Sequence, residues 1–315
     1  MAYPHVKLEN HVADVDECVA SISFATSSND ATIETGLMPF GSSEVRFENW
    51  YTPQPPLARK QEAGLNYAVC DGFVFGSFVI HSQQSVEEAT VSFYQSMFHA
   101  LQACGDFYPL RIWHYLPILY SPTEPTPYQL FCRARSDVIG SLGASYCSAT
   151  VIGTGSRQGV FYFLAVKQAG DCIENPRQTS AYHYPSQYAN PAPLFNRAML
   201  HKVDNCIRLY ISGTASIVGH QSCHPGDVVA QLNEIADNIE SVISTTTKIV
   251  SSFKDKSLDD LRHVKIYLKQ TSDYDKIKPS LENRFSNLHE AQIFHGEICR
   301  PELLIEIEGM VEHLS

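Results

Sequence analysis

The chain has 315 residues, of which 44% are hydrophobic, 18% charged and 11% aromatic, and its formal net charge at pH 7 is -11. This composition excludes an intrinsically disordered chain and leaves room for two domains with sizeable cores. The acidic balance excludes long-range attraction to nucleic acid or anionic membranes, so an anionic ligand would have to be bound by local arginines.

Hydropathy and cysteine usage predict a cytoplasmic protein. No run reaches about 18 apolar residues, and no N-terminal segment has the basic and apolar pattern of a signal peptide. The nine cysteines are dispersed, without CxxC pairs or zinc-type Cys/His spacing. We therefore expect reduced thiols, no membrane span and no bound metal.

The first half of the chain is predicted to run strand, helix, strand, helix, strand, strand. The first helix has an apolar face at helical spacing, and weaker strand signals precede it near residues 20–24 and 67–70. The predicted elements are strand 73–81, helix 86–103, strand 110–116, helix 128–138, and strands 149–153 and 160–166.

The second half repeats this order. Asp227 is expected to cap its long helix, and Ser257 with Asp260 to cap a short helical turn. The predicted elements are strand 207–211, helix 228–250, strand 263–268, helix 274–286, and strands 294–299 and 303–307.

Because the two copies lie roughly 150 residues apart, they indicate a duplicated domain rather than a solenoid. We predict an α+β protein in which each domain is a mixed sheet packed on one side by two helices. The domains are expected at residues 1–170 and 171–315. The tyrosine-rich segment 171–200 is expected to be an ordered inter-domain segment.

The last predicted strand carries the most informative pattern. Period-two alternation places Leu304, Glu306 and Glu308 on one face, and Ile305 and Ile307 on the other. On an inner strand, burial would raise the pKa of Glu306 and make it a general acid near neutral pH. The alternative is an edge strand with its glutamates in solvent.

The second half resembles the RidA/YjgF family. The matching residues are YISG at 210–213, Asp227, Gln231, Asn238, the strand at 264–268, Cys299 with Arg300, and IEIE at 305–308. Residues 70 to 310 resemble a more specific group, the chorismatases. That resemblance lies in WHYLP at 113–117, FCRAR at 131–135, IENPRQTSAYHYP at 173–185 and SGTASIVGH at 212–220.

The resemblance implies an enzyme that splits chorismate and releases pyruvate from its enolpyruvyl ether. It implies two fused RidA/YjgF-like domains, an active site in the second one, and no metal or organic cofactor. RidA proteins are usually trimers, whereas the resemblance implies a monomer for this fused chain. Family members form 3-hydroxybenzoate, 4-hydroxybenzoate, a mixture of the two, or a dihydroxycyclohexadiene carboxylate.

An enol ether is cleaved by protonating its terminal methylene carbon, and Glu306 matches the family position of that acid. Chorismate carries two carboxylates, for which planar guanidinium groups are suited. Arg135 and Arg197 are the leading candidates, with surface salt bridges as the alternative for each. Arg300 matches the carboxylate-binding arginine of RidA, and Arg177 is interpreted as structural.

Three tyrosines, Tyr182, Tyr184 and Tyr188, could line a slot for a flat ring or could pack between the domains. The small residues Gly213, Thr214 and Ala215 could let a ligand approach the backbone, or could form only a tight strand-to-loop transition.

Cys299 is the residue that could choose the product, or it could be a small buried hydrophobe. By resemblance, the enzymes that form 3-hydroxybenzoate have Cys at this position, where the hydrolases have a smaller apolar residue. Ala215 resembles the hydrolase type instead. Cys299 and Ala215 therefore indicate different products. The 3-hydroxybenzoate type is favoured, and the hydrolase and mixed types are left open.

Three other interpretations fit the sequence less well. A metal site at His220, Cys223 and His224 is rejected because these ligands crowd one loop. A RidA-like imine deaminase using Arg300 is disfavoured by the duplicated chain and the ENPRQ run at 174–178. A non-catalytic module that binds small carboxylates is disfavoured because a pure binder has no need of a buried acid.

Overall fold

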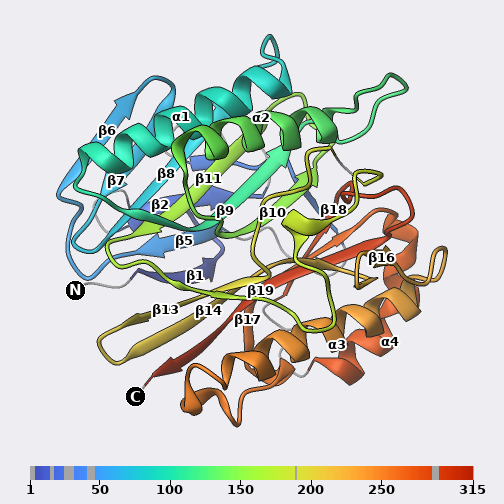
Figure 1. Cartoon of the computed structure of the whole chain (residues 1–315). Helices are drawn as coiled ribbons and strands as arrows, with labels where there is room; N and C mark the ends of the chain where they lie inside the picture. The colour runs from blue at the N-terminus through green and yellow to red at the C-terminus, as the bar shows by residue number, and fades with distance from the viewer. Residues whose placement is uncertain are drawn as a thin grey trace.

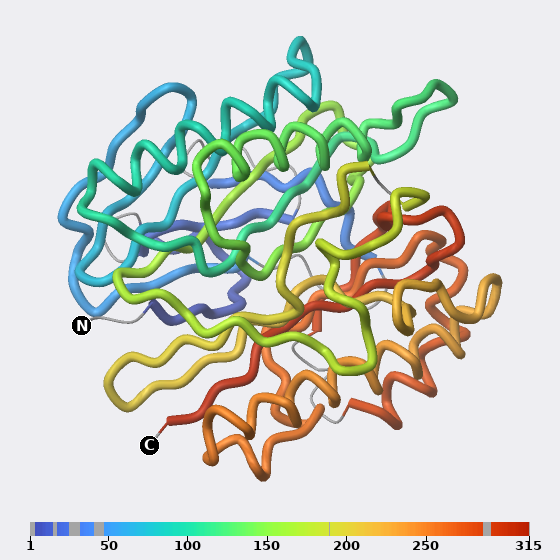
Figure 2. Tube along the Cα trace, in the orientation of Figure 1, coloured from blue at the N-terminus to red at the C-terminus, as the bar shows by residue number. Residues whose placement is uncertain are grey.

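The structure is a computed structural model, and it describes residues 4–14, 18–24, 32–40, 47–188, 190–285 and 291–314. Two large sheets lie in the middle of the molecule, and helices cover their outer faces on opposite sides (Figure 1). The Cα trace has its two ends on the same side of the molecule (Figure 2).

The first large sheet has six strands in the order β10-β9-β11-β8-β7-β6. Helices α1 (Val86–Ala103) and α2 (Pro127–Leu142) cover its outer face (Figure 1), and each begins with a capping box, at Ser85 and Thr126. Its strands are β6 (Ala58–Glu62), β7 (Leu65–Val69), β8 (Phe73–Ile80), β9 (Tyr108–Leu116), β10 (Ser148–Gly153) and β11 (Gly159–Val166).

The second large sheet has seven strands in the order β12-β13-β14-β19-β17-β18-β4, with helices α3 (Val228–Thr246) and α4 (Tyr274–Arg284) against it. Asp227 caps α3 by accepting hydrogen bonds from two backbone N–H groups. The strands are β12 (Asp171–Ile173), β13 (Ala198–Val203), β14 (Cys206–Ala215), β17 (Leu261–Leu268), β18 (Gln292–His295), β19 (Ile305–Leu314) and β4 (Met38–Pro39).

The N-terminal residues form a third, four-stranded sheet, of which only the strand near residues 20–24 is predicted from the sequence. Its order is β1 (His5–Glu9), β5 (Phe47–Tyr51), β2 (Cys18–Ser23) and β3 (Thr32–Glu34). Trp50 of β5 packs against Phe75 and Trp113 of the six-stranded sheet, with ring centroids 5.1 and 6.0 Å apart.

The two large sheets meet along β10. Single β-bridges join Ser148 to Asn196 and Gly153 to Glu297, and the backbone N–H of Ala149 donates to Ser212 Oγ at 2.9 Å. The main hydrophobic core runs from the first sheet into side chains of the second, including Tyr210, Tyr267 and Met310. The inner faces of the sheets therefore pack on one another.

The predicted α+β class is confirmed, as are the order of the predicted helices and strands and the capped turn at Ser257. Strands β12 and β13 were not predicted. Two predictions need correction. The strand predicted at 294–299 ends at His295, so Cys299 lies in the loop at residues 296–304. The edge-strand alternative for Glu306 is wrong, because β19 lies between β14 and β17. The domain boundary at residue 170 stays a prediction.

Candidate active site

Glu306 lies on the inner face of β19. It pairs with Ala215 of β14 and Tyr267 of β17, and only 4% of it is exposed. Ile305 and Ile307 point the other way, into the core beneath α3 and α4. The predicted alternation is observed for residues 305–308, and it directs the Glu306 carboxyl group toward the first sheet. The placement of Leu304 on the glutamate face is wrong, because Leu304 precedes β19 and packs against the same core as Ile305.

A β-bulge makes room for this carboxyl group. The register of β14 against β19 shifts between Ile211 and Thr214, so Gly213 falls in the irregular stretch. A Cβ at position 213 would come within 2.0 Å of Glu306 Oε1. Any larger side chain at this position would have to displace the Glu306 carboxyl group.

Burial, the largest cause, and the nearby Glu308 carboxylate together raise the pKa of Glu306 to about 8, although Arg111 and Arg197 act in the opposite direction. Glu306 therefore carries a proton at neutral pH in the folded protein. A protonated carboxyl group in a pocket is the group that a general acid requires.

Glu306 lines a small cavity of about 30 Å³. Most of its lining comes from the second half of the chain, but Tyr128 is supplied by α2 of the first half. Tyr184, Tyr188, Gly213 and Ala215, all named as candidates from the sequence, line this pocket.

Two arginines line the same pocket. Arg197 donates to Thr179 O at 2.9 Å and to Tyr184 Oη at 2.5 Å, and Arg300 donates to His220 O and Ser222 Oγ at 2.9 and 3.0 Å. Within the part of the chain that the structure describes, buried N–H groups at Arg197 Nε and Arg300 Nη2 have no hydrogen-bond partner. Such buried donors favour an anionic ligand.

The tyrosines hold these guanidinium groups in place. The Arg300 guanidinium lies 3.6 Å above the Tyr188 ring and 5.1 Å from the Tyr184 ring. The Arg197 guanidinium lies 5.5 Å from the Tyr184 ring. Tyr184 and Tyr188 therefore contribute cation–π contacts in addition to aromatic walls.

Cys299 lines the pocket beside these groups and is half-buried. Burial raises the pKa of its thiol to about 12, and the charge of an ionised Glu306 also raises it. The thiol is therefore protonated across the neutral range, and it faces the pocket as an S–H group rather than a thiolate.

Three candidates from the sequence lie outside this lining. Arg135 of α2 lies within the helix–sheet packing, 5.5 Å from the Tyr94 ring and 5.9 Å from the Phe131 ring. Tyr182 packs on Tyr146 and borders a separate groove. The Thr214 hydroxyl donates to the Ser212 carbonyl group. Their substrate contacts stay predictions.

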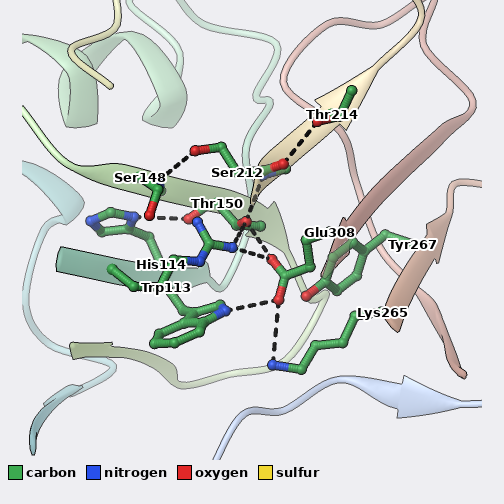
Figure 3. A network of polar contacts seen from close by, with 12 residues as sticks. Trp113, His114, Ser148, Thr150, Ser212, Thr214, Lys265, Tyr267 and Glu308 are labelled. Carbon is green, nitrogen blue, oxygen red and sulfur yellow. Dashed lines mark hydrogen bonds and ion pairs between the residues drawn. The ribbon is translucent and has the colours of Figure 1, made fainter. Parts of the chain in front are cut away.

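A buried charge cluster that was not predicted from the sequence includes Glu308 and Lys265 (Figure 3), and Arg111 pairs with Glu308 in it. The signal was present in the sequence, because Arg111 and Lys265 interrupt strands that are otherwise apolar. Charges at such positions are found buried only when they are paired.

Among the described residues, no three or more His, Cys, Asp and Glu side chains are arranged so that they could hold a metal ion.

Arg177 pairs with Glu234 of α3, which agrees with its structural interpretation. In the described part of the chain, no helix is both long and apolar enough to cross a bilayer.

Comparisons with known proteins place the chain in a family. Residues 48–165 match the model of the family "Chorismatase FkbO/Hyg5-like, N-terminal". A 3-hydroxybenzoate synthase of Streptomyces hygroscopicus is 31% identical over 259 residues, which cover 79% of this chain and 76% of that protein. A chorismatase of the same organism is 31% identical over 277 residues, covering 85% and 80%.

A solved chorismatase structure superposes with a TM-score of 0.86, covering 98% of both chains at 26% identity. Fold and pocket together define an α+β protein with a buried carboxylic acid opposite two arginines. The chain belongs to the chorismatase family.

Proposed function

We propose that this protein cleaves the enolpyruvyl ether of chorismate and releases pyruvate, with Glu306 as the general acid. The observation that carries the proposal is a carboxyl group kept protonated by burial in a pocket that also presents two arginines. The names of the relatives, which include chorismatase and 3-hydroxybenzoate synthase, support this substrate.

The chemistry suits the groups in the pocket. Glu306 gives its proton to the terminal methylene carbon, which becomes a methyl group, and positive charge develops on the ether-bearing carbon. The resulting Glu306 carboxylate stabilises that charge while the bond between the ring carbon and the ether oxygen breaks. The electron pair of this bond stays on the oxygen, which becomes the keto oxygen of pyruvate. The ring cation then either takes over its neighbouring hydroxyl oxygen and loses a proton to give 3-hydroxybenzoate, or takes up water and loses a proton to give the dihydro-diol, and the released proton restores Glu306. The unpaired N–H donors of Arg197 and Arg300 would bind the two carboxylates of the substrate.

The finer proposal is that the ring product is 3-hydroxybenzoate. Cys299 lines the pocket, and one relative of this chain is named 3-hydroxybenzoate synthase. Forming 3-hydroxybenzoate and pyruvate from chorismate consumes no water overall, whereas forming the dihydro-diol consumes one water. Ala215, which lines the same pocket, favours the hydrolase as the second candidate.

Glu306→Gln tests the assignment directly. Since an amide cannot supply the proton, we expect pyruvate release from chorismate to fall by roughly 100- to 10,000-fold. Pyruvate is measured with a coupled assay, and ring products are identified by mass and ultraviolet absorption.

Glu87→Gln is the matched control, because Glu87 pairs with Arg133 on the exposed surface of α1 and α2. It should keep wild-type activity. Near-normal turnover by Glu306→Gln would show that the acid is another group. A wild-type protein that leaves chorismate intact would contradict the function itself.

A further inference from the structure

Glu308 lies two residues beyond Glu306 on the same face of β19, and its carboxylate is enclosed by donors (Figure 3). Arg111 Nη2 and Trp113 Nε1 of β9 donate to it at 2.7 and 2.8 Å. Lys265 Nζ of β17 lies 3.3 Å away, and the Thr150 hydroxyl of β10 donates to it as well. This carboxylate is therefore shared by both large sheets.

The cluster is electrically balanced without Glu306. Lys265 Nζ also pairs with Glu48 of the N-terminal sheet at 2.7 Å, so two buried carboxylates face two buried cations. Glu306 forms no ion pair in the described part of the chain. Ionising it would add an unbalanced negative charge to a desolvated region, which is unfavourable.

A chain of direct contacts joins Glu308 to Glu306 through Thr150. Thr150 Oγ1 donates to Glu308 and accepts from the backbone N–H of Gly213 at 3.0 Å and from Arg111 Nη2 at 2.5 Å. Gly213 is the bulge residue whose Cα faces the Glu306 carboxyl group. The position of Glu306 is thus coupled to the hydrogen bonds that hold Glu308.

The groups that act on Glu306 come from several elements. Arg111 reaches it from the first sheet, Arg197 from the segment before β13, and Arg300 and Cys299 face the same pocket from the loop at 296–304. Burial and Glu308 favour its protonated form, whereas Arg111 and Arg197 oppose it. The pKa of Glu308 itself is raised by burial, but Arg111, Lys265 and the Thr150 and Trp113 hydrogen bonds lower it overall.

We propose that Glu308 is a positioning residue, held ionised by Arg111 and Lys265, that keeps Glu306 protonated and fixes it in the pocket through Thr150 and Gly213. The inference rests on the proposed role of Glu306 as the acid. In this arrangement Glu308 never meets the substrate and acts only through its neighbour.

The test is a direct titration of Glu306 that requires no substrate. The infrared carboxyl band that disappears in Glu306→Gln is followed against pH, with an expected wild-type midpoint of about 8. In Glu308→Gln we expect the midpoint to fall by on the order of one pH unit or more, because a like charge is removed.

The matched control is Glu312→Gln, which alters a glutamate of the same strand that pairs with Arg208. It should leave the midpoint unchanged. An unshifted midpoint in Glu308→Gln would overturn the proposal. If Glu306 titrates as expected but chorismate is not cleaved, the proposed function fails while the role of Glu308 stands.

Should Glu308→Gln not fold, the Thr150 hydroxyl provides a second test that leaves every charge in place. We expect Thr150→Val to lower kcat by roughly tenfold or more with little change in KM, because a small displacement of a catalytic group slows the reaction. Thr150→Ser should restore kcat. Wild-type kcat in Thr150→Val would overturn the proposal.

Discussion

Cys299 is the pocket residue whose chemical state decides what it can do. Its thiol stays protonated because burial, together with the nearby Glu306, raises its pKa to about 12. A neutral thiol is a poor nucleophile but a compact, polarisable wall for a reacting ring. Its proposed influence on the product therefore comes from shape and weak hydrogen bonding rather than from covalent attack.

Cys299→Ala is expected to shift the product from 3-hydroxybenzoate toward the dihydro-diol, because the smaller side chain leaves space for water beside the intermediate. A tenfold change in the product ratio would correspond to about 1.4 kcal/mol between the competing barriers. The ratio is measured by chromatography after complete conversion of chorismate.

Cys172→Ala is the control for this change, because Cys172 is exposed and lies outside the pocket lining. It should leave the ratio at the wild-type value. The same ratio in Cys299→Ala and wild type would remove the proposed role of the thiol.

At the scale of single elements, the bulge in β14 matters most to the site. It takes Ser212 and Gly213 out of register with β19, so Gly213 faces Glu306 while Ser212 Oγ accepts from the Ala149 backbone of the first sheet. One irregularity thus contacts the acid and helps to join the two sheets.

Gly213→Ala is expected to displace the Glu306 carboxyl group, since the new Cβ would lie 2.0 Å from Oε1. The displaced group is the flexible end of a side chain, so we expect a loss of about 1–3 kcal/mol in unfolding free energy. The fall in kcat should be larger, on the order of 100-fold. Urea unfolding and pyruvate release measure the two effects.

Gly140→Ala in α2 is the matched control, because a Cβ there meets no atom within 4 Å. It should keep full activity and gain up to about 1 kcal/mol of stability from better helix propensity. Full activity in Gly213→Ala would show that the bulge does not position the acid.

The sequence predicts best where the pattern is local. The bounds of α1 follow from its apolar face, and the burial of Glu306 follows from two-residue alternation in β19.

The N-terminal sheet was largely missed because its short strands pair at long range, with His5 opposite Tyr51. The charge cluster was missed for the same reason, since Glu48, Arg111 and Lys265 come from three separate sheets. Sequence spacing alone does not show that Arg300 lines the pocket while Arg135 lies in helix–sheet packing, and the substrate contact of Arg135 stays a prediction.

At the scale of the whole molecule, the site ties folding stability to pH. Glu306 has its ordinary pKa of 4.5 in the unfolded chain and about 8 in the folded protein. Above pH 4.5 the unfolded state loses a proton that the folded state keeps. The contribution of Glu306 is therefore fully present below pH 4.5 and is lost as the pH rises toward 8.

Wild type should lose about 3 kcal/mol of unfolding free energy relative to Glu306→Gln between about pH 5.5 and about pH 8. The amide does not titrate, so the difference between the two proteins isolates this one group. Urea unfolding of both proteins at the two pH values measures it. A difference that does not change with pH would mean that the pKa of Glu306 is not raised.

The pairing of β4 with β18 has a consequence for how the chain is made. Met38 and Pro39 leave the ribosome early, yet the strand opposite them lies at Phe294 and His295, about 255 residues later. At about 5–20 residues per second, this partner follows roughly 10 to 50 s afterwards. During translation β4 therefore has no partner strand until synthesis is almost over.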